Sequence, residues 1–307
     1  MGGSLNKLAF FGEGPNTTDT ARTYFGMTET IAGVNAAFPV LPKLNMSLLG
    51  EANGRFVNLR PENGQGSPST EQSVLNPQTA FAQFGEGVRI RPDLAGGYVR
   101  LNYLVNFQEF IAGNSMYSLR RLTLDFGHEF PLYKKTRRMV PREFNGPDDC
   151  SVDKAVHSCP SITRNLEGSF GLRFLMNESF TSSGNQVPFY FQPTLGGSDV
   201  NGNAGLSSYQ DYRFRAPNNL LARASFEHSI WGPFGLTAMI DEGKVAMTHG
   251  DIDFTHLRHS YAAGLTLRAG GFPMVYLLFS WGGREGTHTI TSVNTSLLGG
   301  STRPSLY

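Results

Sequence analysis

The chain has 307 residues, of which 39% are hydrophobic and only 17% charged, with a formal net charge of +1. The near-neutral charge gives no electrostatic basis for nucleic-acid binding, and no run approaches the ~18 apolar residues of a transmembrane helix. Low charge together with 36 glycines, 23 phenylalanines and 11 tyrosines is typical of a membrane β-barrel. A soluble β-sandwich is the alternative that composition leaves open.

Apolar and polar residues alternate along most of the chain, which is the period of a β-strand with two different faces. Around residue 101, for example, Val99, Leu101 and Tyr103 alternate with Arg100 and Asn102. No segment shows the 3.6-residue apolar period of a helix. In chain order, the twelve predicted strands are residues 5–11, 22–38, 44–57, 80–91, 98–110, 116–130, 165–180, 220–231, 235–246, 260–269, 274–282 and 287–298.

The predicted strands are joined mostly by short turns and long loops in alternation. The sequences VLPK, RPDLAGG, WGP and AGGF are short, whereas residues 60–79, 181–216 and 247–258 are long. This alternation is typical of an outer-membrane barrel, with turns at the periplasmic end and loops outside. Residues 112–115 and 283–286 are exceptions, because they form tight links at the end where the other connections are long loops.

A basic insertion at residues 131–164 is a further exception, and it is predicted to be a loop on the short side. Its KKTRR run at 134–138 is predicted first to be solvated, and second to contact lipid headgroups or a partner. The insertion also holds Cys150 and Cys159. These could form a disulfide in an oxidising compartment, or remain reduced without a role.

The N-terminus bears on export. Residues 1–7 (MGGSLNK) lack the basic region and apolar core of a secretory signal. An outer-membrane protein needs such a signal, so either the N-terminus is incomplete or the chain is not exported.

Other chemistry-bearing groups are weaker candidates. Residues 248–259 (THGDIDFTHLRH) have spacings that could suit zinc or calcium, but an exposed loop is the favoured interpretation; the candidate ligands would be His249, Asp251, Asp253, His256 and His259. The glycine-rich residues 12–14 and 282–286 precede no helix and are predicted turns. The sequence therefore predicts no catalytic residue, no metal ligand, no cofactor and no enzymatic activity.

Several motifs between residues 188 and 286 occur in an order that resembles a known family. They are PFYFQPTLGGSD, GLSSYQDYRFRAPNNLLARASFEHSIWG, GLTAMIDEGKVA and DIDFTHLRHSYAAGLTLRAG, and the earlier FFGEGPNTTDTARTYFGMTET adds to them. They resemble the C-terminal barrel of the BamA/TamA outer-membrane assembly factors, also called the bacterial surface antigen family. The resemblance implies an all-β fold, an antiparallel transmembrane β-barrel.

That family's barrel has sixteen strands, so the resemblance implies that this chain holds the last twelve. Residues 1–307 would form one barrel domain without signal peptide or POTRA domains, from an N-terminally incomplete sequence. The expected location is the outer membrane of a Gram-negative-type bacterium. The expected partners are outer-membrane lipids, and possible further ones are client outer-membrane proteins and periplasmic proteins.

The function implied is to assist insertion or translocation of proteins at the outer membrane. Two alternatives stay open. The barrel could anchor or export an attached passenger, such as a patatin-like enzyme domain, or it could be a passive porin or receptor.

In the family, the sixth outer loop folds back into the barrel lumen, and an arginine at its tip is held by acidic residues of the next two strands. The matching acidic positions here are Glu227 and Asp241, and strand parity independently predicts that both face the lumen. The loop tip, however, has Leu206-Ser207-Ser208-Tyr209 in place of the Arg-Gly pair.

The missing arginine puts assembly activity in doubt. Two buried carboxylates need a cation, and the nearest are Arg213 and Arg215, so one of these is expected to pair with Glu227 or Asp241. The candidate functional residues of the loop are Gly196, Gly197, Leu206, Ser207, Ser208, Tyr209, Asp211, Tyr212, Arg213, Phe214 and Arg215.

Overall fold

The computed structural model describes residues 2–61, 80–94, 99–139, 162–197, 199, 205–231, 233–269, 272–282, 285 and 287–293. Within them the chain forms one antiparallel sheet whose strands follow the chain order, β1-β2-β3-β4-β6-β7-β8-β11-β12-β13-β14-β15. The bounds of these strands are β1 Gly2–Phe10, β2 Thr23–Leu41, β3 Met46–Pro61, β4 Ala80–Ile90, β6 Val99–Ala112, β7 Leu119–Met139, β8 Ile162–Phe180, β11 Asn218–Trp231, β12 Phe234–Ala246, β13 Arg258–Ala269, β14 Phe272–Trp281 and β15 Thr287–Val293.

This path confirms the predicted antiparallel barrel of twelve strands. The short β5 (Asp93–Leu94) pairs with β6 beside it, and β9 (Thr194–Leu195) with β10 (Phe214–Arg215) forms a separate two-stranded sheet. The helical elements described are five 3-10 turns, η1 Asp19–Ala21, η2 Pro42–Leu44, η3 Ser115–Tyr117, η4 Phe189–Phe191 and η5 His249–Asp251. None of the helices in the described part of the chain is long and apolar enough to cross a membrane.

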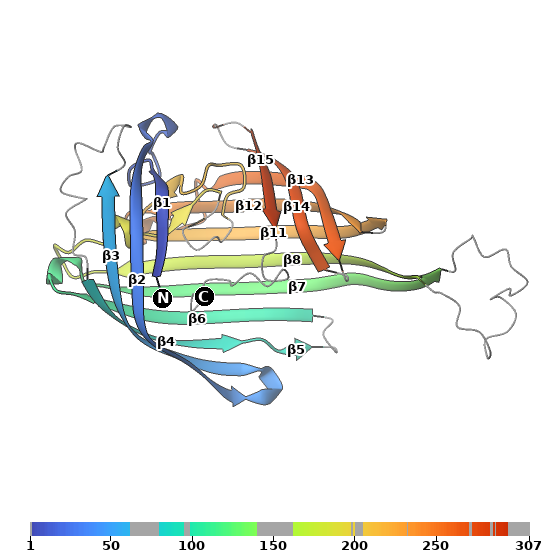
Figure 1. The fold of residues 1–307 in the computed structure, drawn as a ribbon, viewed down its shortest axis with the longest axis horizontal. Helices are drawn as coiled ribbons and strands as arrows, with labels where there is room; N and C mark the ends of the chain where they lie inside the picture. The colour runs from blue at the N-terminus through green and yellow to red at the C-terminus, as the bar shows by residue number, and fades with distance from the viewer. Residues whose placement is uncertain are drawn as a thin grey trace, which may run out of the picture.

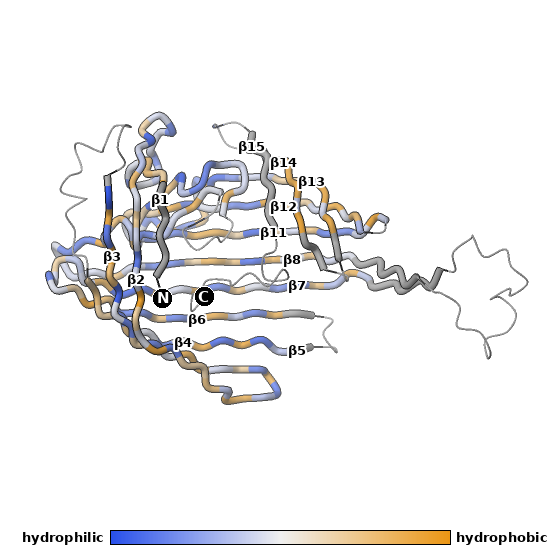
Figure 2. Tube along the Cα trace, viewed as in Figure 1, coloured by the Kyte–Doolittle hydropathy of each residue, from blue (hydrophilic) through white to orange (hydrophobic). Residues whose placement is uncertain are grey.

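The sheet is strongly curved, so that β1–β3 run across the direction of β6–β8 (Figure 1). The two faces of each strand differ as the alternation predicts. In β12, Leu236 and Ile240 are 45% and 46% exposed, whereas Thr237 and Asp241 are buried. Hydrophobic and hydrophilic residues accordingly follow each other along β4, β6, β7 and β8 (Figure 2). The convex face is therefore the apolar one, as in a membrane β-barrel, and the polar residues of the alternation lie on the concave face.

Aromatic and histidine side chains gather at both ends of the convex face. At the end that carries the short turns, the ring pairs are Tyr103–His128, Tyr133–His228 and Trp231–Phe234. At the end that carries the long loops they are Phe180–His249 and Tyr261–Trp281. Two such girdles flanking an apolar band are the pattern of an outer-membrane barrel.

The expectation that residues 131–164 form a loop is wrong for part of this segment. β7 continues to Met139 and β8 begins at Ile162, and the two strands remain paired to their ends. These residues were not predicted as strand because their sequence does not alternate between apolar and polar residues. Cys150 and Cys159 lie outside the described residues.

Candidate functional site

The described residues between β8 and β11 (181–197, 199 and 205–217) fold back against the concave face of the sheet. The β9–β10 pair forms the stem of this loop, with Phe214 opposite Leu195 and Arg215 opposite Thr194. The turn after β9 requires glycine. Gly196 has φ +111°, and a Cβ on it would lie 2.6 Å from the Cβ of Arg213. These residues thus form a second layer inside the sheet, which we call the lumen loop.

The first half of the lumen loop is held by aromatic packing. The ring of Phe191 lies 4.7 Å from Phe81 and 5.0 Å from Phe110 between centroids, and Phe189 lies 5.2 Å from Phe10. Such ring pairs contribute about 0.5–1.5 kcal/mol each beyond their buried area. The buried cluster draws on β1–β4, β6, β7 and the lumen loop, and consists of Leu8, Phe10, Phe25, Met27, Val57, Phe81, Phe110, Ala112, Leu119, Val187, Phe189, Tyr190 and Phe191.

The tip of the lumen loop is held by hydrogen bonds to strands β12–β14. The backbone N–H and the hydroxyl of Ser207 both donate to Oδ2 of Asp241, at 3.2 and 2.8 Å. The Ser208 N–H donates to the hydroxyl of Ser260 at 2.6 Å, and the Ser280 hydroxyl donates to the carbonyl of Ser207 at 2.8 Å. We call Ser207 and Ser208 with these partners the serine latch.

The cation that neutralises Asp241 comes from the barrel wall. Arg223 of β11 stands directly opposite Asp241 in register and donates to both its oxygens, from Nε at 2.5 Å and Nη2 at 3.1 Å. The same Nη2 also donates to the carbonyl of Gly205 at 2.6 Å. Asp241 therefore joins a bidentate wall arginine to the neutral donors of the loop tip.

A second arginine lies next to Arg223 on the concave face. Arg173 of β8 is directly opposite Arg223 in register, and it donates from Nε and Nη2 to the two oxygens of Asp125, each at 2.9 Å. Like charges opposite each other destabilise a sheet. Here each arginine has a carboxylate on its far side, so the row Asp125, Arg173, Arg223, Asp241 is electrically balanced.

The expected ion pair between Asp241 and Arg213 or Arg215 is wrong. Arg213 binds Glu285 from Nε and Nη2, both at 2.6 Å, and also donates to the side chain and carbonyl of Thr17, at 2.8 and 2.6 Å. The reason is that the β9–β10 stem places Arg213 beside residues 11–17, where its guanidinium lies 5.0 Å from the ring of Phe11. Asp241 is already satisfied by Arg223 and Ser207.

Arg215 is buried as deeply as Arg213 but has weaker partners. Its Nη1 donates to the carbonyl of Phe189, its Nη2 has no hydrogen-bond partner, and no ion pair joins it to a carboxylate among the described residues. Burial lowers the pKa of this loop arginine to about 10, against a smaller opposing effect of Glu13.

The remaining predicted residues are placed as follows. Glu227 stands opposite Thr237 in register. It is four residues along β11 from Arg223, which contacts the loop tip, and this separation corresponds to about 13 Å along the strand. Tyr209 packs edge-on against Phe214 at 5.1 Å. Asp211 lies against Gly197, where an added Cβ would be 2.2 Å from its Oδ1. Leu206 is fully buried and Tyr212 packs partly against the aromatic cluster.

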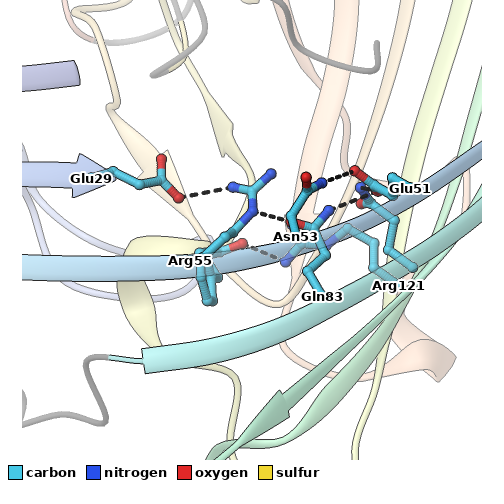
Figure 3. Close-up of polar contacts among 8 residues, drawn as sticks. Glu29, Glu51, Asn53, Arg55, Gln83 and Arg121 are labelled. Atoms are coloured by element: carbon cyan, nitrogen blue, oxygen red, sulfur yellow. Dashed lines mark hydrogen bonds and ion pairs between the residues drawn. The ribbon is translucent and has the colours of Figure 1, made fainter. Parts of the chain in front are cut away.

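A polar network beneath the aromatic cluster was not predicted. Glu51 accepts hydrogen bonds from Asn53 Nδ2 at 2.9 Å and Gln83 Nε2 at 2.7 Å (Figure 3). It also accepts one from Gln108 Nε2 at 2.6 Å. Arg55 binds Glu29 at 2.8 Å beside it. The alternation of apolar and polar residues in β3 predicts that Glu51, Asn53 and Arg55 share one face. It does not show that the residues of this network come from four strands.

Beside this network, Arg121 of β7, which stands opposite Gln108 in register, contacts the lumen loop. Its Nη2 donates to the carbonyl of Phe191, and its guanidinium lies 5.8 Å from the ring of Phe110. Arg121 therefore ties the aromatic part of the lumen loop to β7 by a hydrogen bond.

The histidine-rich segment 248–259 does not come together around one point. His249 pairs with Glu178 at 2.6 Å, Asp253 with Lys244 at 2.6 Å, and His259 with Glu242 at 3.4 Å. In the part of the chain that the structure describes, no three His, Cys, Asp or Glu residues are grouped to hold a metal.

Comparisons with known proteins identify the fold. No family model matches the chain, and no curated protein sequence matches it. Among solved structures, it is similar to BamA from Haemophilus ducreyi lacking POTRA domains 1–3, with a TM-score of 0.52 and 12% sequence identity. The match covers 88% of this chain and 54% of that one, so the chain spans about half the length of that structure. The likeness shows a BamA-like barrel fold.

Proposed function

We propose that this chain is an outer-membrane barrel of the BamA/TamA type that assists insertion or translocation of other proteins at that membrane. The observation that carries the proposal is the lumen loop, which is fixed to Asp241 by its tip and lies inside a BamA-like barrel fold. The proposed activity requires no bond chemistry, because a barrel can template a client strand through backbone hydrogen bonds.

The mode of attachment of the loop tip supports a movable rather than a permanent plug. The wall ion pair Arg223–Asp241 does not involve a charged group of the tip. Release of Ser207 and Ser208 therefore breaks hydrogen bonds worth about 0.5–1.5 kcal/mol each, or up to about 3 for those to the carboxylate. The balanced wall pair would remain when the tip departs.

The lumen loop also disfavours a passive porin. Leu206, Tyr209, Phe214 and Ala216 pack against Leu221 of β11 and other strand residues in a second buried cluster. A diffusion pore needs an open polar interior, whereas this interior holds two apolar clusters.

The test is assisted folding of a client. The full chain is reconstituted into phospholipid vesicles, and an unfolded outer-membrane protein is added from urea. We expect client folding to be several-fold faster than in empty vesicles, measured by its heat-modifiable mobility in gels. An equal rate in both would refute the proposed function.

The control addresses the site. Asp241→Ala removes the acceptor of the serine latch and leaves Arg223 without its counterion, so we expect it to alter the rate. Asp253→Ala, in an exposed loop with its own partner Lys244, should leave the rate unchanged. Identical rates for Asp241→Ala and the wild type would remove the serine latch from the mechanism.

A further inference from the structure

The loop that joins β12 to β13, residues 247–257, folds over the convex face of the sheet. His249 forms an ion pair with Glu178 of β8 at 2.6 Å. Further along the loop, Asp253 accepts a hydrogen bond from Nζ of Lys244 in β12 at 2.6 Å. Because β11 lies between β8 and β12, the loop crosses β11 from one contact to the other. We call residues 247–257 the outer flap.

The strand residues that hold the outer flap belong to the convex side of the sheet. Glu178 has the parity of the exposed Leu172, and Lys244 has that of the exposed Ile240. Leu220 of β11 stands opposite Lys244 in register and shares its face, yet it is only 2% exposed. The outer flap therefore covers part of an apolar face that is open elsewhere.

Phe254 is the most exposed large apolar side chain of the outer flap, at 70%. Its ring lies 6.5 Å from that of Phe174 between centroids. At the other contact, the ring of His249 stacks on Phe180 at 4.8 Å. Phe174 and Phe180 are six residues apart in β8, which corresponds to about 20 Å along the strand. The flap thus extends from the aromatic girdle toward the middle of the apolar face.

The polar groups on either side of Phe254 are bonded to each other. The Asp253 carboxylate accepts from the N–H and the hydroxyl of Thr255, at 2.9 and 2.8 Å, in addition to Lys244. The Lys244 ammonium also donates to the carbonyl of Thr255 at 3.2 Å. The acid is therefore neutralised by a base, and the backbone next to the ring has partners. A segment that enters hydrocarbon needs both conditions.

We propose that the outer flap binds membrane lipid, with the ring of Phe254 seated among acyl chains at the loop-bearing side of the barrel. The occupant is hydrocarbon because the exposed side of this ring continues the apolar convex face, which a membrane barrel presents to lipid. Contact with acyl chains removes its apolar area from water, and this is favourable. The inference rests on the membrane location in the proposed function but not on the assembly activity.

The test places a fluorescent reporter on the flap. Trp231→Phe with Trp281→Phe removes both natural tryptophans, and Phe254→Trp adds one reporter to the full chain, which is reconstituted into phosphatidylcholine vesicles. We expect brominated acyl chains to quench this reporter several-fold relative to unbrominated lipid. Acrylamide in the water should quench it several-fold less than it quenches free tryptophan. Strong quenching by acrylamide and none by bromine would overturn the proposal.

The matched variants test the support beneath the ring. Lys244→Met in the reporter protein removes the bonds to Asp253 and Thr255, so bromine quenching should become several-fold weaker. Lys43→Met, at an exposed lysine in η2, should leave it unchanged. Equal quenching in these two variants would contradict the role of the flap. Heat-modifiable mobility in gels checks that each variant is folded.

A second reporter separates this inference from the membrane location on which it rests. It is the protein that keeps Trp281 as its one tryptophan, with phenylalanine at position 254. Bromine quenching of Trp281 without quenching of the flap reporter would overturn the placement of the flap alone. Absence of quenching in both proteins would overturn the membrane location as well.

Discussion

Arg213 and Arg215 are two residues apart and both buried, yet their surroundings differ. Arg213 has a bidentate carboxylate partner in Glu285, and Arg215 has one carbonyl bond and a free Nη2. Breaking a buried ion pair leaves an unpaired charge and costs ~3–5 kcal/mol, whereas replacing a poorly paired charge by an apolar group is often neutral or stabilising. The same substitution should therefore destabilise the protein at position 213 but not at position 215.

We expect Arg213→Met to lower the free energy of unfolding by roughly 3 kcal/mol. The reason is that Glu285 loses its ion-pair partner and Thr17 loses its hydrogen bonds to the lumen loop. Arg215→Met should change it little or raise it. The measurement is the urea midpoint of unfolding in detergent micelles, followed by tryptophan fluorescence. A larger loss for Arg215→Met than for Arg213→Met would contradict this assignment of the two arginines.

Parity alone identified Asp241 but not its partner. Strand alternation placed Arg223 in the polar set, and counting residues back from the turn at Trp231 and Phe234 brings Arg223 opposite Asp241. The direction of Arg213 could not be predicted, because it depends on the β9–β10 stem and on residues 11–17, which are nearly 200 positions away in the sequence.

At the scale of strands, glycines on the concave face make room for large polar side chains of the neighbouring strand. Gly85 of β4 stands opposite Glu51 of β3, and a Cβ on it would lie 2.3 Å from Oε1 and 2.6 Å from Cγ of Glu51. On the convex side of β3, Gly50 has no atom within 4 Å of its added Cβ. The two glycines form a natural comparison.

Gly85→Ala should displace Glu51 from its three amide donors and lower the free energy of unfolding by about 1–3 kcal/mol. Gly50→Ala should be neutral or slightly stabilising, since alanine restricts the unfolded chain. Thermal unfolding of the two variants, followed by circular dichroism, makes the comparison. Equal changes in the unfolding temperature of the two variants would show that the missing side chain at Gly85 is not what allows Glu51 to take its position.

The strands were predictable wherever one face is apolar and exposed and the other faces the interior of the sheet. β4 is Ala80–Ile90 against a prediction of 80–91. The outer parts of β7 and β8 were missed because their basic sequence lacks an oily face, and backbone pairing there is a property of the ribbon that alternation does not report. The lumen loop was recognised by its length and by family resemblance, while its internal β9–β10 pair was not.

At the scale of the molecule, the two tryptophans report on both girdles. Trp231 is 63% exposed at the turn-bearing end, and Trp281 is 40% exposed at the loop-bearing end, both on the convex face. We expect Trp231→Phe and Trp281→Phe single-tryptophan proteins in brominated-lipid vesicles to be quenched more by bromines near the headgroup than by bromines near the chain end. Deep quenching of either one, or none at all, would contradict the membrane position derived from the girdles.

The filled interior should also limit ion flow. We expect the reconstituted chain to conduct little in planar bilayers, and the triple substitution of Phe189, Tyr190 and Phe191 by serine to raise the conductance several-fold, because it removes the aromatic cluster from the lumen. Phe226→Ser on the convex face serves as control. High conductance of the unmodified chain would show that the lumen loop does not close the barrel.

The wall origin of the guanidinium at Asp241 has an electrical consequence. Ser207 and Ser208 carry no formal charge, so lifting them out of the interior transports none across the bilayer at that point. A membrane potential does about 2.3 kcal/mol of work on each elementary charge that crosses the bilayer for each 100 mV. It does no such work on the uncharged side chains of Ser207 and Ser208. Detachment of this tip should thus be insensitive to holding potential, unlike the gating of a segment that ends in an arginine.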